Sequence, residues 1–133
     1  MKSPELQALA LSVILGLIQV LLAATFAIRE RGLRWALSPR EESVEPLKGL
    51  AGRVGRAFYN FMETFPLFAA LVLLCQALGV HDSLTLWGVG LYFWARVAYL
   101  PIYMAGVHGL RTVTWFVSVA GIALLLVAIF QSG

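Results

Sequence analysis

The chain has 133 residues, of which 60% are hydrophobic and only 13% charged, and its formal net charge is +3. A soluble domain of this length cannot bury so much apolar surface, so the composition predicts a single integral membrane domain over residues 1–133. The excess positive charge falls mostly in one loop, which is typical of membrane orientation. Nucleic-acid binding needs a broad basic face, and we expect no nucleic-acid partner.

Four stretches are long and apolar enough to cross a hydrocarbon core of about 30 Å, which takes roughly 20 helical residues. They cover residues 6–28, 57–78, 84–104 and 113–130. The second and third connections are short, so consecutive helices should be antiparallel neighbours. The sequence therefore predicts an all-α membrane protein, a four-helix bundle with up-down topology.

The first connection, residues 29–56, is long and strongly charged. Its charged residues are Arg29, Arg31, Arg34, Arg40, Lys48, Arg53 and Arg56 against Glu30, Glu41, Glu42 and Glu45. Because Lys and Arg near span ends concentrate in the cytoplasm, we predict that this loop is cytoplasmic and that the third connection, with Arg111, lies on the same side. Both termini then face the opposite compartment.

The metal-binding residue types are few and scattered. The chain has one cysteine, Cys75, so an intrachain disulfide and a cysteine-rich metal site are impossible. His81 and His108 lie in short loops that we expect on opposite sides of the membrane. They cannot share a metal ion, and we predict no metal site.

Polar side chains follow one face of each of the two middle spans. On the second span, an arc of about 80° holds Arg53, Arg56, Asn60 and Glu63. On the third span, an arc of about 60° holds Tyr92, Arg96, Tyr99 and Tyr103. Polar groups in membrane helices rarely face lipid, so these two faces should meet each other or a shared cleft.

The depth of each residue predicts which side chains meet. At 1.5 Å per residue, Glu63 lies about 9–10 Å inside one end of its span, and Arg96 about 12 Å inside the corresponding end of the next. We therefore predict an ion pair between Glu63 and Arg96, direct or through one intervening group. Asn60 and Tyr99 follow nearer the membrane surface.

The outermost polar residues form a positively charged rim. Arg56 and Tyr103 are expected there at equal height, in the same half of the membrane as Arg53 and Arg111. One glutamate cannot balance so many arginines, and guanidinium groups bind carboxylates in a bidentate fork. The pattern favours an anionic ligand over a purely structural network, whose interhelical hydrogen bonds contribute about 1 kcal/mol or less each.

The stretch RVGRAFYNFMETFPLF resembles the second-helix motif R-A-x-x-N-x-x-E-x-x-P of the MAPEG family, the membrane-associated proteins in eicosanoid and glutathione metabolism. Its motif positions are occupied by Arg56, Ala57, Asn60, Glu63 and Pro66. ARVAYLPIY in the third span and LRTVTWFV at the start of the fourth are also similar to family members. The resemblance extends over all four spans and is greatest to a bacterial branch.

The resemblance implies a homotrimer in a bacterial inner membrane, with both termini periplasmic. Glutathione would bind near the cytoplasmic side between neighbouring subunits, and lipophilic substrates would reach it from the bilayer. Arg56, Asn60 and Glu63 would bind the glutathione backbone, with Glu63 available to its ammonium group. Further glutathione contacts are implied for Tyr99, Tyr103, Arg53, Arg31 and Arg34.

The resemblance also implies two catalytic positions. Arg111 occupies the place of an arginine proposed to stabilise the thiolate in one family member, and Thr112 matches a serine beside the thiol in others. An adjacent cation lowers a thiol pKa from about 8.5 towards neutrality, which increases the population of the nucleophile. Phe58 and Trp115 depart from ligand-contacting residues of those relatives.

Three functions are compatible with these features. The first is a glutathione-dependent transferase or peroxidase acting on lipophilic electrophiles, and the second is a non-catalytic lipid-binding or accessory protein of the same fold. The third is a small multidrug transporter, which typically needs an acidic residue in its first span, and residues 6–28 contain none. The retained motif and Arg111 favour the first function.

Overall fold

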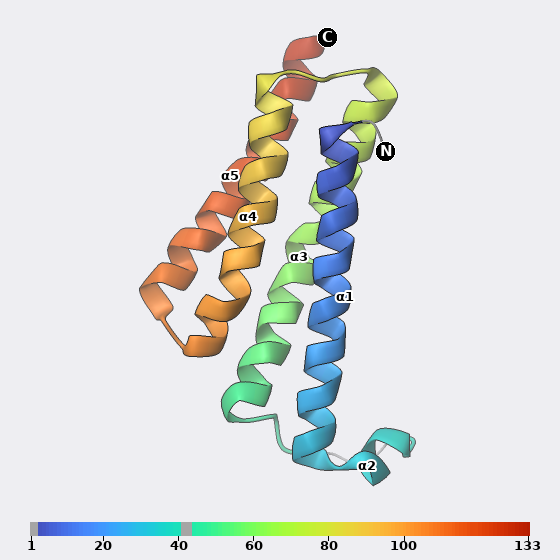
Figure 1. The fold of residues 1–133 in the computed structure, drawn as a ribbon, viewed down its shortest axis with the longest axis vertical. Coiled ribbons are helices and arrows are strands. Elements are labelled where there is room, and N and C mark those ends of the chain that lie inside the picture. The colour runs from blue at the N-terminus through green and yellow to red at the C-terminus, as the bar shows by residue number, and fades with distance from the viewer. Residues whose placement is uncertain (1–2, 41–43) are drawn as a thin grey trace.

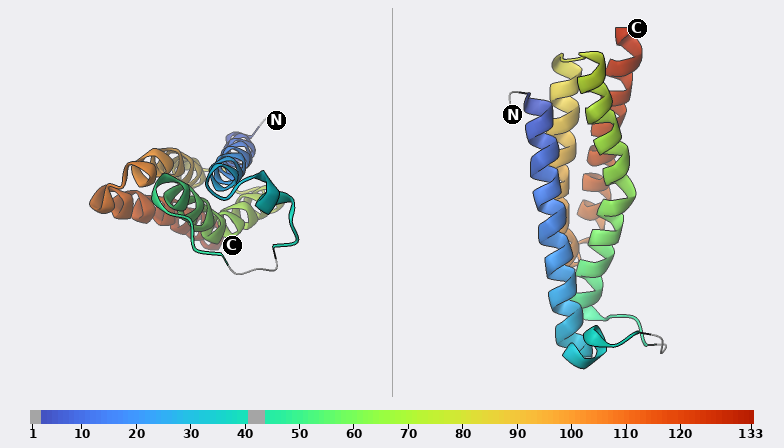
Figure 2. Two further views of the ribbon diagram at one scale, coloured as in Figure 1. Left: turned by 90° about the horizontal axis from the view of Figure 1, so that it is seen from below. Right: turned by 90° about the vertical axis from the view of Figure 1, so that its right-hand side faces the viewer.

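The computed structural model describes residues 3–40 and 44–133, which contain helices and their connections and no strand. The helices are α1 (Pro4–Arg31), α2 (Leu33–Leu37), α3 (Gly49–Leu78), α4 (Ser83–Ala105) and α5 (His108–Ser132). The four long helices run roughly parallel to one another and alternate in direction, while α2 turns aside at the end of α1 (Figures 1 and 2). The predicted all-α fold is confirmed.

Within the described residues, three helices are long and apolar enough to cross a membrane, namely α1, α3 and α5. The sequence predicted four such spans. The remaining helix, α4, has 23 residues but does not reach the same apolar composition. Its polar stripe lowers its hydropathy, because Tyr92, Arg96, Tyr99 and Tyr103 extend over half of the helix, whereas the polar stripe of α3, which ends at Glu63, lies in its first half.

The long first connection is more ordered than the sequence suggested. Helix α3 begins at Gly49 rather than near residue 57, so Arg53 and Arg56 lie on the helix instead of in the loop. The Glu30 carboxylate accepts a hydrogen bond from the backbone N–H of Lys48, with oxygen distances of 3.2 and 3.3 Å. This contact joins the end of α1 to the start of α3.

A polar network that the sequence did not predict joins α1 to α4 at the other end of the molecule. The buried Glu5 carboxylate accepts hydrogen bonds from the hydroxyls of Ser3 and Thr85, both at 2.7 Å. Thr85 also belongs to the capping box that begins α4 with Asp82. These bonds place the start of α1 directly beside the start of α4.

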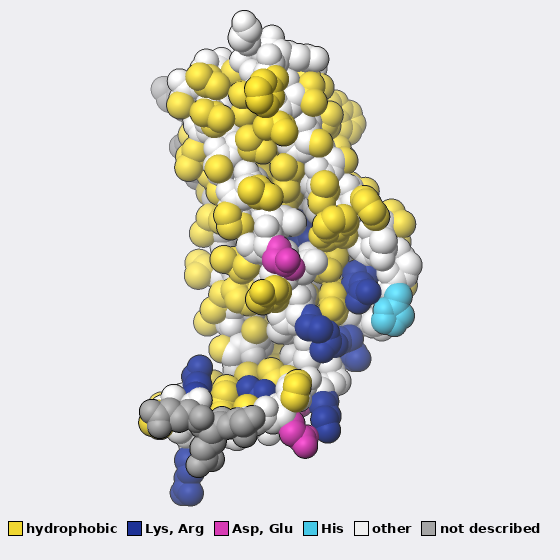
Figure 3. Space-filling model, turned by 180° about the vertical axis from the view of Figure 1, so that it is seen from behind, with side chains coloured by type: hydrophobic (Ala, Val, Ile, Leu, Met, Phe, Trp, Pro, Cys, Tyr) yellow, Lys and Arg dark blue, Asp and Glu magenta, His cyan; other side chains and the backbone are white. Residues whose placement is uncertain are grey.

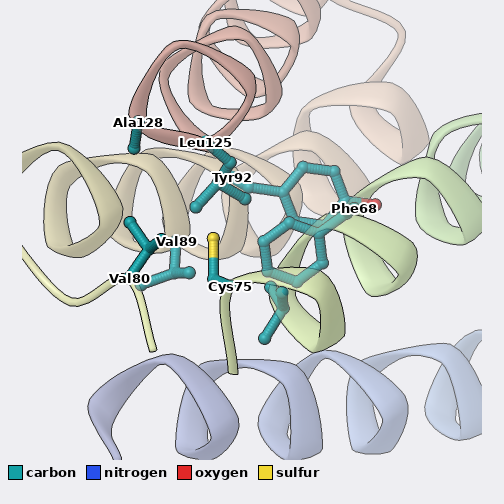
Figure 4. Close-up of a cluster of buried hydrophobic side chains, with 8 residues drawn as sticks. Phe68, Cys75, Val80, Val89, Tyr92, Leu125 and Ala128 are labelled. Atoms are coloured by element: carbon teal, nitrogen blue, oxygen red, sulfur yellow. The ribbon is translucent and has the colours of Figure 1, made fainter. Parts of the chain in front are cut away.

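The main buried cluster packs α3, α4 and α5 together and includes Tyr92, the first residue of the polar stripe on α4 (Figure 4). Its residues are Phe68, Val72, Cys75, Val80, Val89, Tyr92, Leu125 and Ala128. The rings of Phe68 and Tyr92 stack with their centroids 4.0 Å apart, and the Tyr92 hydroxyl is 3.1 Å from that of Thr64. This packing turns the polar faces of α3 and α4 towards each other one to two turns further along.

Helices α4 and α5 approach most closely where Gly88 meets Gly121. A Cβ atom on Gly121 would lie 2.6 Å from the carbonyl oxygen of Gly88 and 2.8 Å from the backbone nitrogen of Tyr92. The absence of side chains at these two glycines permits the close approach of the helices. Gly90 has no atom within 4 Å of its added Cβ and lies outside this contact.

We expect Gly121→Ala to destabilise the protein because backbone atoms cannot move aside for the added methyl group. The two helices must separate, at a cost of about 1–3 kcal/mol. Thermal unfolding in detergent should show a lower Tm. Gly90→Ala is the matched control and should leave Tm unchanged or raise it, since the site is open and Ala favours helix over Gly. Equal losses in both variants would contradict this account of the α4–α5 contact.

Candidate functional site

Hydrogen bonds join α3 to α4 along the faces that the sequence predicted to meet. Arg53 Nε donates to the carbonyl oxygen of Met104 at 2.9 Å, and Arg56 Nε donates to the hydroxyl of Tyr103 at 3.3 Å. Arg56 and Tyr103 are the two residues predicted to lie at equal height at the rim. The polar faces of the two helices therefore do face each other.

Glu63 and Arg96, predicted to pair directly or through one intervening group, form no direct ion pair among the described residues. Arg96 Nη1 instead donates to the Asn60 side-chain oxygen at 2.9 Å, so the Arg96 side chain reaches about one helical turn nearer the rim than expected, whereas Arg56 and Tyr103 keep the expected register. The Arg96 guanidinium also lies against two aromatic rings, 4.1 Å from the centroid of Tyr99 and 5.7 Å from that of Phe61. These cation–π contacts hold the side chain away from the glutamate.

Arg96 places an uncompensated positive charge behind the site. Its side chain is only 2% exposed, and its Nε and Nη2 atoms are buried without a hydrogen-bond partner among the described residues. The bond to Arg96 occupies the amide oxygen of Asn60. The amide nitrogen of Asn60 is thus left to donate hydrogen bonds in the other direction.

A cavity of about 510 Å³ opens beside this network, between α3, α4 and the first turns of α5. Its volume is within the range of about 300–1,000 Å³ that is usual for small-molecule sites. The lining residues are Arg56, Tyr59, Asn60, Glu63, Tyr99, Tyr103, Arg111, Thr112, Trp115 and Phe116. The structure therefore brings most of the candidate site residues from three separate helices to one cavity.

Tyr59 and Phe116 line the cavity but were not among the candidate residues. Helical spacing would have found both. Tyr59 is three residues after Arg56 and four before Glu63, and Phe116 is four residues after Thr112, so each shares a face with a candidate residue. Tyr59 is 71% exposed and Phe116 is 61% exposed, so the cavity has an open aromatic side.

Tyr103 connects two of the positive charges of the cavity. Its hydroxyl accepts the hydrogen bond from Arg56, and its ring lies 4.8 Å from the guanidinium carbon of Arg111. With Arg96 behind Asn60, three arginines surround a cavity whose described lining contains one carboxylate, that of Glu63. The site is therefore positively charged overall.

Three arginines proposed for the same ligand lie elsewhere in the chain. Arg53 is bonded to the end of α4 and does not line the cavity. Arg31 and Arg34 line a different cavity, beside Trp35 at the junction of α1 and α2. One chain by itself does not bring these three side chains to the polar cavity.

The described lysines and arginines gather towards one end of the molecule. On the face shown in Figure 3, lysines and arginines lie over the lower part, whereas the upper part is hydrophobic. Figure 1 shows that the α1–α3 connection and the α4–α5 turn lie towards this lower end, and that both termini lie at the other. This arrangement agrees with the prediction that the two basic connections share one side.

The fold and the site thus define an all-helical membrane protein with a positively charged cavity near one end of its helices. A family model, that of the MAPEG family, matches residues 8–131, nearly the whole chain, and the protein belongs to this family. It is a family of membrane proteins of glutathione and eicosanoid metabolism, and its members typically use glutathione as substrate or cofactor. A comparison with curated proteins finds no match.

Proposed function

We propose that the polar cavity binds glutathione and that the protein is a glutathione-dependent transferase or peroxidase acting on lipophilic electrophiles. The observation that carries this proposal is the charge of the cavity, whose described lining holds Arg56 and Arg111 against the single carboxylate of Glu63, with Arg96 bonded to Asn60 behind it. Glutathione has two carboxylates and one ammonium group, so its net negative charge complements the positive charge of the cavity.

Each lining group has a role that follows from its free atoms. Arg56 is held through Nε, which leaves its two terminal nitrogens to bind a carboxylate in a fork. The free amide nitrogen of Asn60 donates to a second acceptor of the ligand. The Glu63 carboxylate accepts from the ammonium group, and Tyr99 lines the same cavity.

Arg111 is the best candidate to hold the sulfur as a thiolate, which is the nucleophile that bound glutathione supplies. It lies in the first turn of α5, and the ring of Tyr103 supports its guanidinium group. The Thr112 hydroxyl donates to the carbonyl oxygen of His108 at 3.2 Å, so its proton is already engaged. Arg111 therefore stabilises the negative charge of the thiolate, whereas the Thr112 hydroxyl oxygen is left to accept a hydrogen bond.

The open side of the cavity supports assembly as a homotrimer. Glu63 lies halfway along α3, one of the membrane-spanning helices, and it is exposed in a single chain. An ionised side chain in that position is costly unless protein or ligand covers it. A neighbouring copy would cover it, and lipophilic substrates would enter from the bilayer past Tyr59, Trp115 and Phe116.

The proposal is tested by replacing the carboxylate-binding arginine of the cavity. Arg56→Gln should weaken glutathione binding about 10- to 100-fold, because a hydrogen bond to a charged group contributes about 1.5–3 kcal/mol. Binding is measured as the rise in Tm with glutathione, and turnover as conjugation of chlorodinitrobenzene. Wild-type protein should show both effects.

Arg29→Gln is the matched control, because it removes the same charge from the end of α1, outside the cavity. It should bind glutathione as the wild type does. Binding without turnover would favour the alternative, a lipid-binding or accessory protein of the same fold. Absence of binding at millimolar glutathione in the folded wild type would contradict the proposal.

A further inference from the structure

A second group of arginines lies at the junction of α1 and α2, away from the polar cavity. A cavity of about 570 Å³ is found there, with Arg31, Arg34 and Arg40 in its lining together with Trp35 and Ser38. None of its lining residues belongs to the polar cavity of the proposed function. It is therefore a separate site.

Trp35 holds two of these arginines by its indole ring. The guanidinium carbons of Arg31 and Arg40 both lie 4.7 Å from the ring centroid. Like charges that gather around one ring repel each other, and each cation–π contact contributes only about 0.5–1 kcal/mol at exposed sites. An anion between the guanidinium groups would relieve this repulsion.

The backbone of Arg40 has an unfavourable conformation. Its φ angle of 61° is in the left-handed region, which costs a residue other than glycine about 1–2 kcal/mol. The Ser38 hydroxyl accepts from the Arg40 backbone N–H at 3.3 Å, and the Arg40 side chain donates to the carbonyl oxygen of Ala36 at 3.0 Å. These bonds fix Arg40 over Trp35, and strain of this kind occurs most often at functional sites.

The described carboxylates of this region are engaged with Lys48. Glu30 accepts from its backbone N–H, and Glu45 pairs with its Nζ at 3.3 Å. No described carboxylate pairs with Arg31, Arg34 or Arg40.

Trp35 contributes a further unmet hydrogen bond. Its Nε1 atom is buried and has no acceptor among the described residues. Arg31 donates to the backbone carbonyl of Glu45 at 2.7 Å and Arg40 to that of Ala36, so no carboxylate among the described residues neutralises these guanidinium groups. A phosphate group has several negatively charged oxygens and would do so.

The position of α2 identifies the source of that phosphate. The helix follows directly after α1, which is apolar enough to span a membrane, so it lies where the lipid headgroups begin. Leu33 and Leu37 are four residues apart and share one face of α2, with exposures of 61% and 79%. Exposed leucines beside arginines are typical of a helix that lies in the membrane interface.

We propose that Arg31, Arg34 and Arg40, arranged around Trp35, bind the phosphate of an anionic phospholipid headgroup. The leucines of α2 enter the acyl layer below it. This lipid site is additional to the glutathione cavity and does not depend on the proposed catalytic function. It also assigns to Arg31 and Arg34 a ligand other than glutathione.

The test uses the full-length protein and native mass spectrometry with phosphatidylglycerol, phosphatidylcholine and inorganic phosphate as separate probes. Wild-type protein should bind phosphatidylglycerol at least about ten-fold more tightly than phosphatidylcholine. Each arginine near an anionic surface contributes about five-fold in affinity, so Arg34→Gln/Arg40→Gln should remove most of this preference. Arg29→Gln removes a single charge from α1 outside this cavity and should keep the preference, whereas Arg34→Gln alone, the matched change inside the cavity, should lower it about five-fold.

Two outcomes would overturn the lipid site. One is a loss of preference for phosphatidylglycerol in Arg29→Gln as large as that in Arg34→Gln, which would show a general effect of charge. The other is binding of inorganic phosphate with no preference between the two lipids, which would show a site for free phosphate. The Tm of each variant verifies folding, and unchanged glutathione binding by Arg34→Gln/Arg40→Gln shows that the two sites are independent.

Discussion

Arg111→Gln should lower the rate of glutathione conjugation at neutral pH by about 10- to 100-fold, and raising the pH should restore most of that rate. Without the guanidinium group, the pKa of the bound thiol returns towards about 8.5, and each unit of this rise removes about nine-tenths of the thiolate at a lower pH. The measurement is the pH dependence of kcat with chlorodinitrobenzene. The wild-type profile should level off at a lower pH than that of the variant.

Two further variants separate charge from geometry at this position. Arg111→Lys keeps the positive charge but loses the planar contact with Tyr103, so its profile should lie between those of the wild type and Arg111→Gln. Thr112→Val should have a smaller effect, because the Thr112 hydroxyl donates to the backbone of His108. A uniform loss of rate in Arg111→Gln, with no change in the shape of the profile, would show that Arg111 does not act on the thiol.

Glu63→Gln should weaken glutathione binding about 10- to 100-fold, because the only carboxylate in the described lining of the cavity is lost. The side chain keeps its size, so the loss reports the charge. Calorimetric titration should compare glutathione with an analogue in which hydrogen replaces the ammonium group. Wild-type protein should discriminate between these two ligands, and Glu63→Gln should bind both with similar affinity.

This comparison is a double-mutant cycle, with one change in the protein and one in the ligand. The matched control is Glu45→Gln, which removes a carboxylate that pairs with Lys48 outside the cavity. That variant should discriminate between the ligands as the wild type does. If Glu63→Gln retains full discrimination, then the ammonium group binds elsewhere and the assigned orientation of glutathione is wrong.

The helices and their polar faces could be predicted from the sequence because both follow from short-range periodicity. The apolar runs predict the long helices, and the spacing of Arg56, Asn60 and Glu63 predicts one helix face. The hydrogen bond from Arg56 to Tyr103 confirms that this face meets α4.

The partner of Arg96 could not be predicted from depth alone. Its side chain reaches Asn60, one turn nearer the rim than Glu63, and this reach depends on the packing of Phe61 and Tyr99 around the guanidinium group. The error in the ion pair therefore has a tertiary cause. The net charge of the cavity depends on the same packing, because an Arg96 side chain paired with Glu63 would leave less positive charge around the cavity.

The contacts at the ends of α1 also lacked a signal in the sequence. Glu5 is buried by residues that lie about 80 positions further along the chain, in the α3–α4 turn and the start of α4. The cavity around Trp35 requires the left-handed conformation of Arg40, which no local rule predicts for arginine. Both features depend on where distant segments or strained residues are placed.

The most direct measurement is a density map of the full-length protein in a lipid bilayer with saturating glutathione. Density for the tripeptide is expected beside Asn60, with one carboxylate at Arg56, the ammonium group at Glu63 and the sulfur next to Arg111. A well-ordered map in which an acyl chain fills that cavity, or in which glutathione lies elsewhere, would contradict it.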